Sequence, residues 1–136
     1  MNILVVDSQG GRIGQLLCEA LIKEDKNYKI TAVGTNSAAT AAMLKGGAHE
    51  AATGENAVIV CAKRADIITG ALGIVIADSM LGEITPAMAL AIGGAQAKKI
   101  LLPVSRCNNI VAGVPDKSIS QLVSDAVRLI SASAQS

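Results

Sequence analysis

Near its amino end the chain carries a run of residues, D-S-Q-G-G-R-I-G (7–14), whose types and order suit the binding of an anion. A short aliphatic run (3–6) precedes it, and an apolar helical repeat follows. Strand, glycine-rich turn and helix in direct succession are typical of the phosphate-binding opening of a Rossmann-like unit. Glycine lets the backbone approach an anion closely, and the first turn of the helix offers it unpaired N–H groups. We therefore expect a ligand site here, although the sequence indicates no reaction.

The candidate ligand-binding residues lie at two predicted strand ends. Glycines provide room for the backbone, and hydroxyl and amide side chains provide hydrogen bonds: Ser8, Gln9, Gly10, Gly11, Gly14, Thr35 and Asn36. The match to the motif G-x-G-x-x-G is partial, because Gln9 stands where the first glycine belongs. A tight turn that needs glycine for packing alone is therefore an alternative interpretation.

The end of the second predicted strand bears on the class of ligand. A site for NAD usually has Asp or Glu there to bind the ribose hydroxyls, whereas this chain has the residues G-T-N-S (34–37). We therefore disfavour ordinary NAD as a cofactor. A chain of 136 residues also leaves little room for a separate substrate domain. A mononucleotide, or a small phosphorylated or carboxylated metabolite, fits the sequence better.

An enzyme acting at the same strand ends is a second hypothesis, and an oligomeric regulatory or structural subunit without a ligand is a third. The candidate catalytic groups are three carboxylates and one thiol: Asp7, Glu55, Asp78 and Cys107. Arg106 would favour the reactive thiolate of Cys107, but an inert, half-buried thiol is the commoner case.

Glu83 is expected to cap a helix or to pair with a lysine. We expect no metal site, since the chain has one histidine and no zinc-binding cysteine spacing.

Apolar periodicity predicts strands that alternate with helices along the chain. The expected strands cover residues 3–6, 28–33, 49–52, 65–69, 99–104 and 110–114. The expected helices cover residues 11–24, 38–45, 56–64 and 86–92, with a last helix opened by a capping box of Ser118 and Gln121. Residues 57–61 would also suit a strand, and residues 73–77 suit either a strand or the start of a helix. Residues 131–136 are expected to be a frayed tail.

This alternation predicts an α/β fold of three layers, in which a mostly parallel sheet has helices on both faces, as in Rossmann- or flavodoxin-like proteins. One domain over residues 1–136 accounts for the length. Ligands of such sheets bind outside the carboxyl ends of the strands. Most polar runs of the chain fall at these predicted ends, and we expect them to converge: residues 7–9, 34–36, 53–56 and 105–108.

The composition narrows the range of partners. The chain is 51% hydrophobic but has one Tyr and no Phe or Trp, so it lacks the stacking platforms that single-stranded nucleic acids need. Its net charge of +1 also argues against a nucleic-acid partner. The uncharged run at residues 84–97 contains Pro86 and is shorter than the roughly 18–20 residues of a membrane span. We expect a cytoplasmic protein without a membrane partner, and the apolar excess favours a homo-oligomer.

Several segments, taken together, resemble a known family. They are V-V-D-S-Q-G-G-R-I-G, G-T-N-S-A-A-T-A-A-M-L-K-G-G-A, A-T-G-E-N-A, A-D-I-I-T-G, A-D-S-M-L-G-E-I-T-P and P-V-S-R-C-N. Their combination resembles an uncharacterised family of small Rossmann-like proteins, found mainly in anaerobic Gram-positive bacteria and described as a domain of unknown function. The resemblance covers nearly the whole chain and implies a bacterial cytoplasmic protein. It implies no activity.

Overall fold

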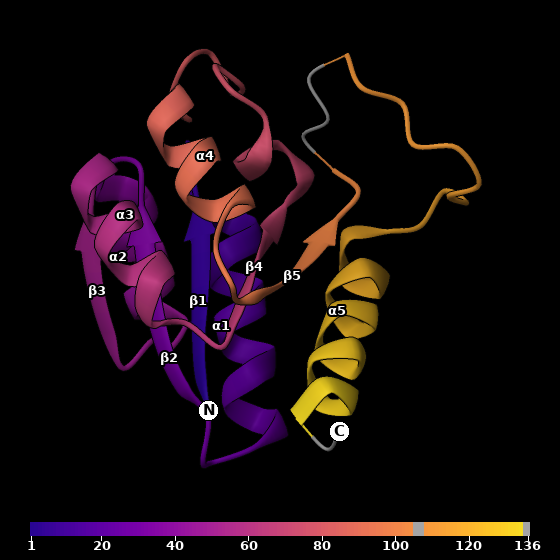
Figure 1. Ribbon diagram of the computed structural model, residues 1–136. Helices are drawn as coiled ribbons and strands as arrows, with labels where there is room; N and C mark the ends of the chain where they lie inside the picture. Colours follow the sequence, from indigo (N-terminus) through magenta and orange to yellow (C-terminus); the bar gives the residue numbers. More distant parts are fainter. Residues whose placement is uncertain (105–107, 135–136) are drawn as a thin grey trace.

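The structure is a computed structural model that describes residues 1–104 and 108–134. Its strands form a five-stranded parallel sheet in the order β3-β2-β1-β4-β5 (Figure 1). The strands are β1 (Asn2–Asp7), β2 (Lys29–Gly34), β3 (Glu50–Thr53), β4 (Ile67–Ala71) and β5 (Lys98–Leu102). The central position of β1 places the glycine-rich turn that follows it near the middle of the sheet.

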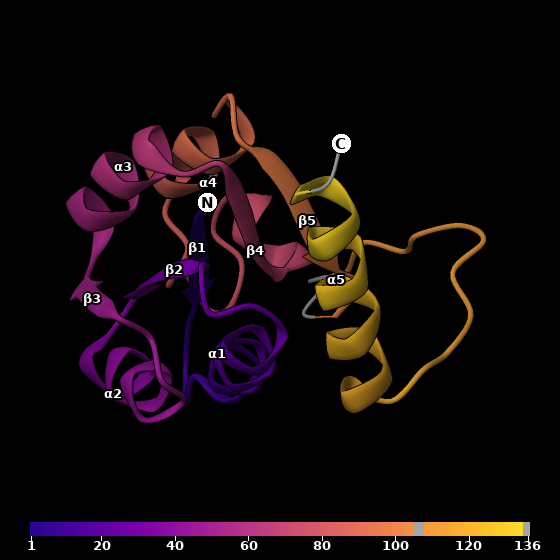
Figure 2. The same cartoon turned by 90° about the horizontal axis from the view of Figure 1, so that it is seen from below.

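Helices cover both faces of the sheet. They are α1 (Arg12–Glu24), α2 (Ser37–Lys45), α3 (Glu55–Arg64), α4 (Pro86–Gly93) and α5 (Ile119–Ala134), with a short 3-10 helix η1 (Leu72–Val75). Helices α1, α2 and α5 pack on one face, and α3 and α4 pack on the other (Figure 2). In the part of the chain that the structure describes, no helix is long and apolar enough to cross a membrane.

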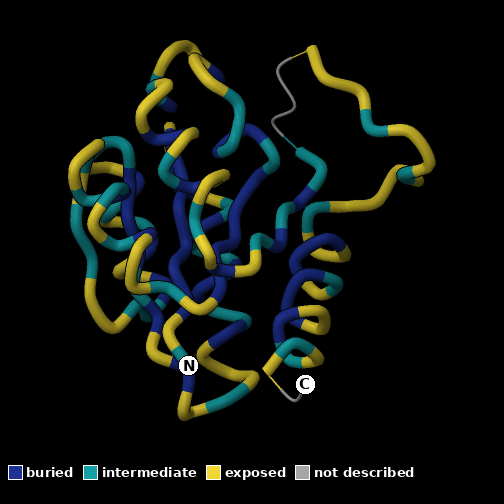
Figure 3. The backbone as a smooth tube through the Cα atoms, in the orientation of Figure 1, coloured by how far each residue is buried: buried dark blue, intermediate teal, exposed yellow. Residues whose placement is uncertain are grey.

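Strand β1 contributes to both halves of the core. Ile3 and Val5 lie in the cluster with α1 and α5, whereas Leu4 and Val6 lie in the cluster with α3 and α4. Successive side chains of a strand point to opposite faces, so a strand covered on both faces must be apolar throughout. Figure 3 shows the resulting pattern: the central strands are buried, and exposed residues lie on the helices and connections.

The order of the strands reverses between β1 and β4. The chain moves outward from β1 to β2 and β3, then crosses to the other side of β1 to form β4 and β5. This is the Rossmann order and differs from the order of flavodoxin. The predicted three-layer α/β fold is therefore confirmed, with a sheet whose described pairs are all parallel.

The ambiguous segments are resolved by the structure, and one expected strand was wrong. Residues 56–64 are helical (α3), and residues 72–75 form the single turn η1. The predicted strand at 110–114 is absent: Ile110 is 92% exposed, and left-handed backbone at Asn108 and Gly113 interrupts an extended conformation. In the tail expected at 131–136, residues 131–134 are helical, because α5 continues to Ala134.

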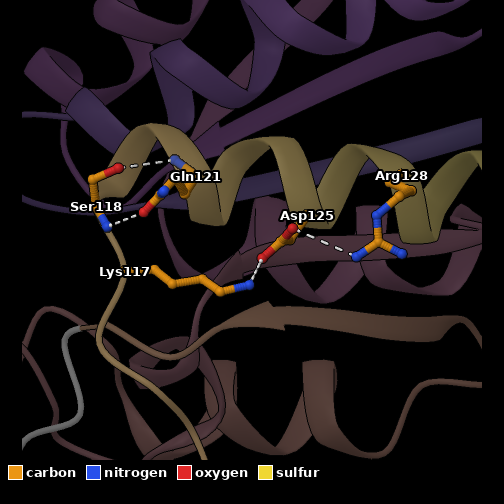
Figure 4. Close-up of polar contacts among 5 residues, drawn as sticks. All are labelled: Lys117, Ser118, Gln121, Asp125 and Arg128. Carbon is orange, nitrogen blue, oxygen red and sulfur yellow. Dashed lines mark hydrogen bonds and ion pairs between the residues drawn. The ribbon is translucent and has the colours of Figure 1, made fainter.

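Helix α5 begins with the predicted capping box (Figure 4). The Ser118 N–H donates to Gln121 Oε1 at 3.0 Å, and the Gln121 N–H donates to Ser118 Oγ at 3.2 Å. One turn later, Asp125 accepts Lys117 Nζ at 2.7 Å and faces Arg128 at 3.5 Å. The hydrogen bond from Lys117 lowers the pKa of Asp125. The capping box defines where α5 starts.

Replacing the capping serine tests this start. Ser118→Ala should lower the free energy of unfolding by about 1 kcal/mol, because the Gln121 N–H loses its partner. Urea unfolding followed by circular dichroism measures the change. Ser120→Ala, at an exposed position of the same turn, is the control and should stay within about 0.5 kcal/mol of the wild type. Equal losses in the two variants would contradict the capping role.

Candidate functional site

Asp7, the last residue of β1, lies beneath the glycine-rich turn. Its side chain is only 5% exposed. One carboxylate oxygen accepts the Ser8 N–H at 2.8 Å, and the other accepts the Gly14 N–H at 2.7 Å. Burial raises the pKa of Asp7, and the two N–H donors oppose that rise. Both oxygens thus accept backbone N–H groups, which tie the turn and the start of α1 to the end of β1.

The amino end of α1 is open next to the turn. Its N-cap residue, Gly11, has φ 73°, and no side chain caps the helix. Within the described residues, the N–H groups of Arg12 and Ile13 have no hydrogen-bond partner. A depression of about 140 Å³ lies here, lined by Asp7, Ser8, Gln9, Gly10, Gly11, Arg12, Ile13 and Met80. Free N–H groups, the helix dipole and the Arg12 charge all favour an anion in this depression.

The three glycines of the turn differ in what a side chain would meet at their positions. A Cβ on Gly11 would lie 2.7 Å from the Ala39 Cα in α2, so Gly11 allows α1 and α2 to pack closely. A Cβ on Gly14 would lie 2.5 Å from the Met43 sulfur. A Cβ on Gly10 would meet nothing within 4 Å. Packing therefore accounts for Gly11 and Gly14, whereas Gly10 faces open space.

The connection between η1 and α4, the 76–85 loop, approaches the turn at the carboxyl ends of the strands (top of Figure 1). Three of its non-glycine residues have left-handed backbone: Asp78, Met80 and Leu81, with φ of 64°, 54° and 58°. The Ser8 hydroxyl donates to the Met80 sulfur. Left-handed backbone costs a non-glycine residue about 1 kcal/mol or more. Contacts such as that between Met80 and Ser8 must therefore hold the loop in this conformation.

Glu83, in this loop, joins the ends of β1 and β2. Its Oε1 accepts the Gln9 N–H at 2.8 Å, the Thr35 hydroxyl at 2.6 Å and the Asn36 Nδ2 at 2.8 Å. These donors, Thr35 foremost, lower the pKa of Glu83. The expectation that Glu83 caps a helix or pairs with a lysine was wrong, because Thr85 caps α4 and the partners of Glu83 are neutral.

Asn36 is held in place at both ends of its amide group. Its Oδ1 caps α2 by accepting the Ala39 N–H at 2.9 Å. Its Nδ2 donates to Glu83 and also to the Gln9 carbonyl at 3.0 Å. Because the oxygen is committed to the helix, the nitrogen is oriented as a donor toward the turn.

The predicted site residues converge in part. The turn and the end of β2 come together through Gln9 and Asn36, and Ser8 lies buried beside them. Glu55 lies at the start of α3, where it accepts the Thr85 hydroxyl at 2.6 Å, and Asp78 is exposed. Residues 105–107, which include Arg106 and the candidate nucleophile Cys107, lie outside the described residues. The three candidate catalytic carboxylates, Asp7, Glu55 and Asp78, therefore have different hydrogen-bond partners and do not form one cluster.

The other cysteines occupy structural positions. Cys18 is buried in the core, and burial raises its pKa to about 12. Burial also raises the pKa of Cys61, on α3. Thiols with raised pKa values are poor nucleophiles near neutral pH. In residues 1–104 and 108–134, no group of three or more His, Cys, Asp or Glu side chains could hold a metal ion.

Sequence reasoning placed neither Glu83, Met80 nor Arg12 in the site. Glu83 is 47 residues from Asn36, and no local pattern connects them. Met80 belongs to the same loop and offers no chemical signal of its own. The position of Arg12 could have been found, because a cation that immediately follows a glycine turn lies at the first position of the predicted helix.

Comparison with known proteins gives the family of the chain. A family model described as Domain of unknown function (DUF3842) matches residues 2–135. The chain belongs to this family. A search of curated proteins gave no match. For this DUF3842 protein, any functional argument therefore starts from the geometry of the site.

The close packing at Gly11 predicts a selective loss of stability in this DUF3842 protein. Gly11→Ala should lower the free energy of unfolding by about 2–4 kcal/mol, because the Ala39 backbone would have to move and alanine would adopt a left-handed conformation. Gly10→Ala, its matched control, should stay within about 1 kcal/mol of the wild type. Urea unfolding of both variants measures this. Similar losses at the two positions would contradict the assignment of Gly11 to packing.

The hydrogen bonds to Glu83 predict a pH-dependent stability. Folding lowers the pKa of Glu83 below its ordinary value of 4.5. The ionised group therefore stabilises the fold above that value, and this contribution disappears as the pH falls through the folded-state pKa. The difference in unfolding free energy between the wild type and Glu83→Gln should be present at neutral pH and shrink in acid. Urea unfolding between about pH 7 and about pH 3 tests this, and a constant difference would contradict it.

Proposed function

We propose that this protein binds a small phosphorylated molecule, either a mononucleotide or another phosphorylated metabolite, with a phosphate at the amino end of α1. The observation that carries the proposal is the uncapped end of this helix, where the N–H groups of Arg12 and Ile13 are free among the described residues. Gly10 leaves open space beside them. Such an arrangement attracts a phosphate through both hydrogen bonding and charge.

The position of this helix end also supports the proposal. It follows β1, beside the point where the strand order reverses, and ligands of doubly wound sheets bind at such points. The depression of about 140 Å³ is smaller than the roughly 300–1,000 Å³ of a pocket that encloses a drug-sized ligand. We therefore propose that a phosphate enters it and that the rest of the ligand extends toward Thr35 and Asn36. Because β2 ends without an acidic residue, NAD remains disfavoured.

We further propose that the protein acts in the cytoplasm as a homo-oligomer. Leu90 on α4 is 75% exposed, and residues 84–97 around it carry no charge. An apolar helix surface of this kind favours burial against another chain. The described cysteines, Cys18 and Cys61, are free thiols, which suits a reducing compartment.

Native mass spectrometry of gently purified protein tests ligand binding directly. A mass per subunit above that of the denatured chain would reveal a bound molecule and its chemical class. Thermal shifts with inorganic phosphate, pyrophosphate and the ribonucleoside monophosphates extend the test to weak ligands. We expect at least one of these probes to raise the melting temperature, because a ligand at about 100 times its Kd stabilises the folded state by about 2.7 kcal/mol.

Gly10→Asp locates the site. It adds a carboxylate where nothing lies within 4 Å of the new Cβ, so the fold should persist while anion binding is lost. Asn27→Asp is the control, since it adds one carboxylate at an exposed position beyond the carboxyl end of α1, outside the uncharged run 84–97. Ligand binding by Gly10→Asp at the wild-type level would exclude this site. A bare wild-type mass together with no thermal shift for any probe would overturn the proposed function.

A further inference from the structure

Three neutral donors beside the depression already bind an oxyanion in this structure. They are the Gln9 N–H, the Thr35 hydroxyl and the Asn36 Nδ2, and we refer to them as the donor triad. All three reach the same atom, Glu83 Oε1, at 2.6–2.8 Å. Hydrogen bonds to an ionised acceptor are short and stronger than those between neutral groups. The carboxylate of Glu83 therefore shows what kind of group the donor triad accepts.

The donor triad is held ready by contacts that do not involve Glu83. The Asn36 Oδ1 caps α2, so its nitrogen is available only as a donor. The Thr35 N–H donates to the Asp7 carbonyl at 3.0 Å, which ties the end of β2 to the end of β1. The backbone of Gln9 is left-handed, with φ 51°, within the turn that lines the depression. An oxyanion from another molecule would find the same donors in place.

Glu83 reaches the donor triad from an exposed part of the 76–85 loop, whose base is fixed by the buried Met80 and Ile84 and by backbone hydrogen bonds within the loop. Glu83 itself is only half-buried, and Leu81, two residues before it, is 98% exposed. Asp78, Met80 and Leu81 all have left-handed backbone. Hydrogen bonds within the loop hold these conformations, so the Glu83 side chain can leave the donor triad while the backbone of the loop stays in place. A competing anion would need only to replace three hydrogen bonds at the edge of the site.

We propose that the donor triad binds a second anionic group of the ligand and that Glu83 is its internal competitor. The ligand then carries two anionic groups, a phosphate at the amino end of α1 and a phosphate or carboxylate at the donor triad. Its entry displaces the Glu83 carboxylate, which turns toward solvent. This inference rests on the proposed function, since it adds to the same site a second subsite and a side chain that competes with the ligand for it.

Isothermal titration of Glu83 variants tests the displacement. The probes are pyrophosphate, which carries two phosphates, and 2-phosphoglycolate, which carries a phosphate and a carboxylate. For the probe that binds more tightly, the affinity of Glu83→Ala should be at least tenfold higher than that of the wild type. The affinity of Glu83→Gln should lie between those of the wild type and Glu83→Ala, because an amide competes less well for the donors than a carboxylate. Glu83→Gln also keeps the size of the side chain, so one of the two variants retains the shape of the loop.

Two further variants distinguish the removal of a competitor at the donor triad from the mere loss of one negative charge from the protein. Glu50→Ala removes a carboxylate that accepts the Thr31 hydroxyl at 2.9 Å on the edge strand β3, outside the donor triad, and its affinity should equal that of the wild type. Adding Thr35→Val to Glu83→Ala removes one donor of the triad and should abolish the gain. Thr35→Val leaves the Asn36 cap of α2 in place.

The outcomes distinguish this inference from the proposed function. If the wild type binds a probe but Glu83→Ala binds it no more tightly, or if Glu50→Ala gains as much, the inference is overturned and the proposed function stands. A weaker affinity in Glu83→Ala would also overturn it, because Glu83 would then contact the ligand directly. If neither the wild type nor Glu83→Ala binds any phosphate probe, both proposals fail together.

Discussion

The carboxylate of Asp7 is the interaction on which the site depends. It ends the central strand and ties the first turn of α1 to the sheet through the Gly14 N–H, while its other oxygen accepts the Ser8 N–H. Burying a charged group is costly unless it is hydrogen-bonded, and these two donors offset that cost. Because Asp7 takes the Gly14 N–H, the earlier N–H groups of Arg12 and Ile13 are the ones left open. The hydrogen bond that anchors α1 thus decides which N–H groups of the helix end stay open.

The second organising contact, at Glu83, follows from the topology of the sheet. The reversal of strand order places the connection after β4 beside the connection after β1, so residues far apart in the sequence meet at the same edge. Glu83 crosses from one to the other and reaches the end of β2 as well. Its charge lies next to a helix end that favours anions. The candidate site therefore contains a negative group of its own, which satisfies donors that would otherwise face water.

Much of the fold could be predicted from the sequence because its signals are local. Apolar periodicity located the elements from β1 to α4, and the caps at Thr85 and Ser118 are side-chain hydrogen bonds within one turn. The prediction of a strand at 110–114 was wrong because an apolar run forms a strand only where a neighbouring strand can pair with it. Ile110 instead lies exposed in the connection before α5. The strand order, which brings the turn and the 76–85 loop together, has no local signal at all.

The site could be located from the sequence but not assembled. The glycine motif marked a turn that the structure places between β1 and α1. The motif alone does not distinguish a glycine needed for packing from one that leaves open space. The structure separates them by what a Cβ would meet: backbone of α2 at Gly11, and open space at Gly10. The same limit applies to Glu83, whose role depends on three donors from other segments. A motif therefore indicates where the backbone turns, and the chemistry of the site follows only from what the turn faces.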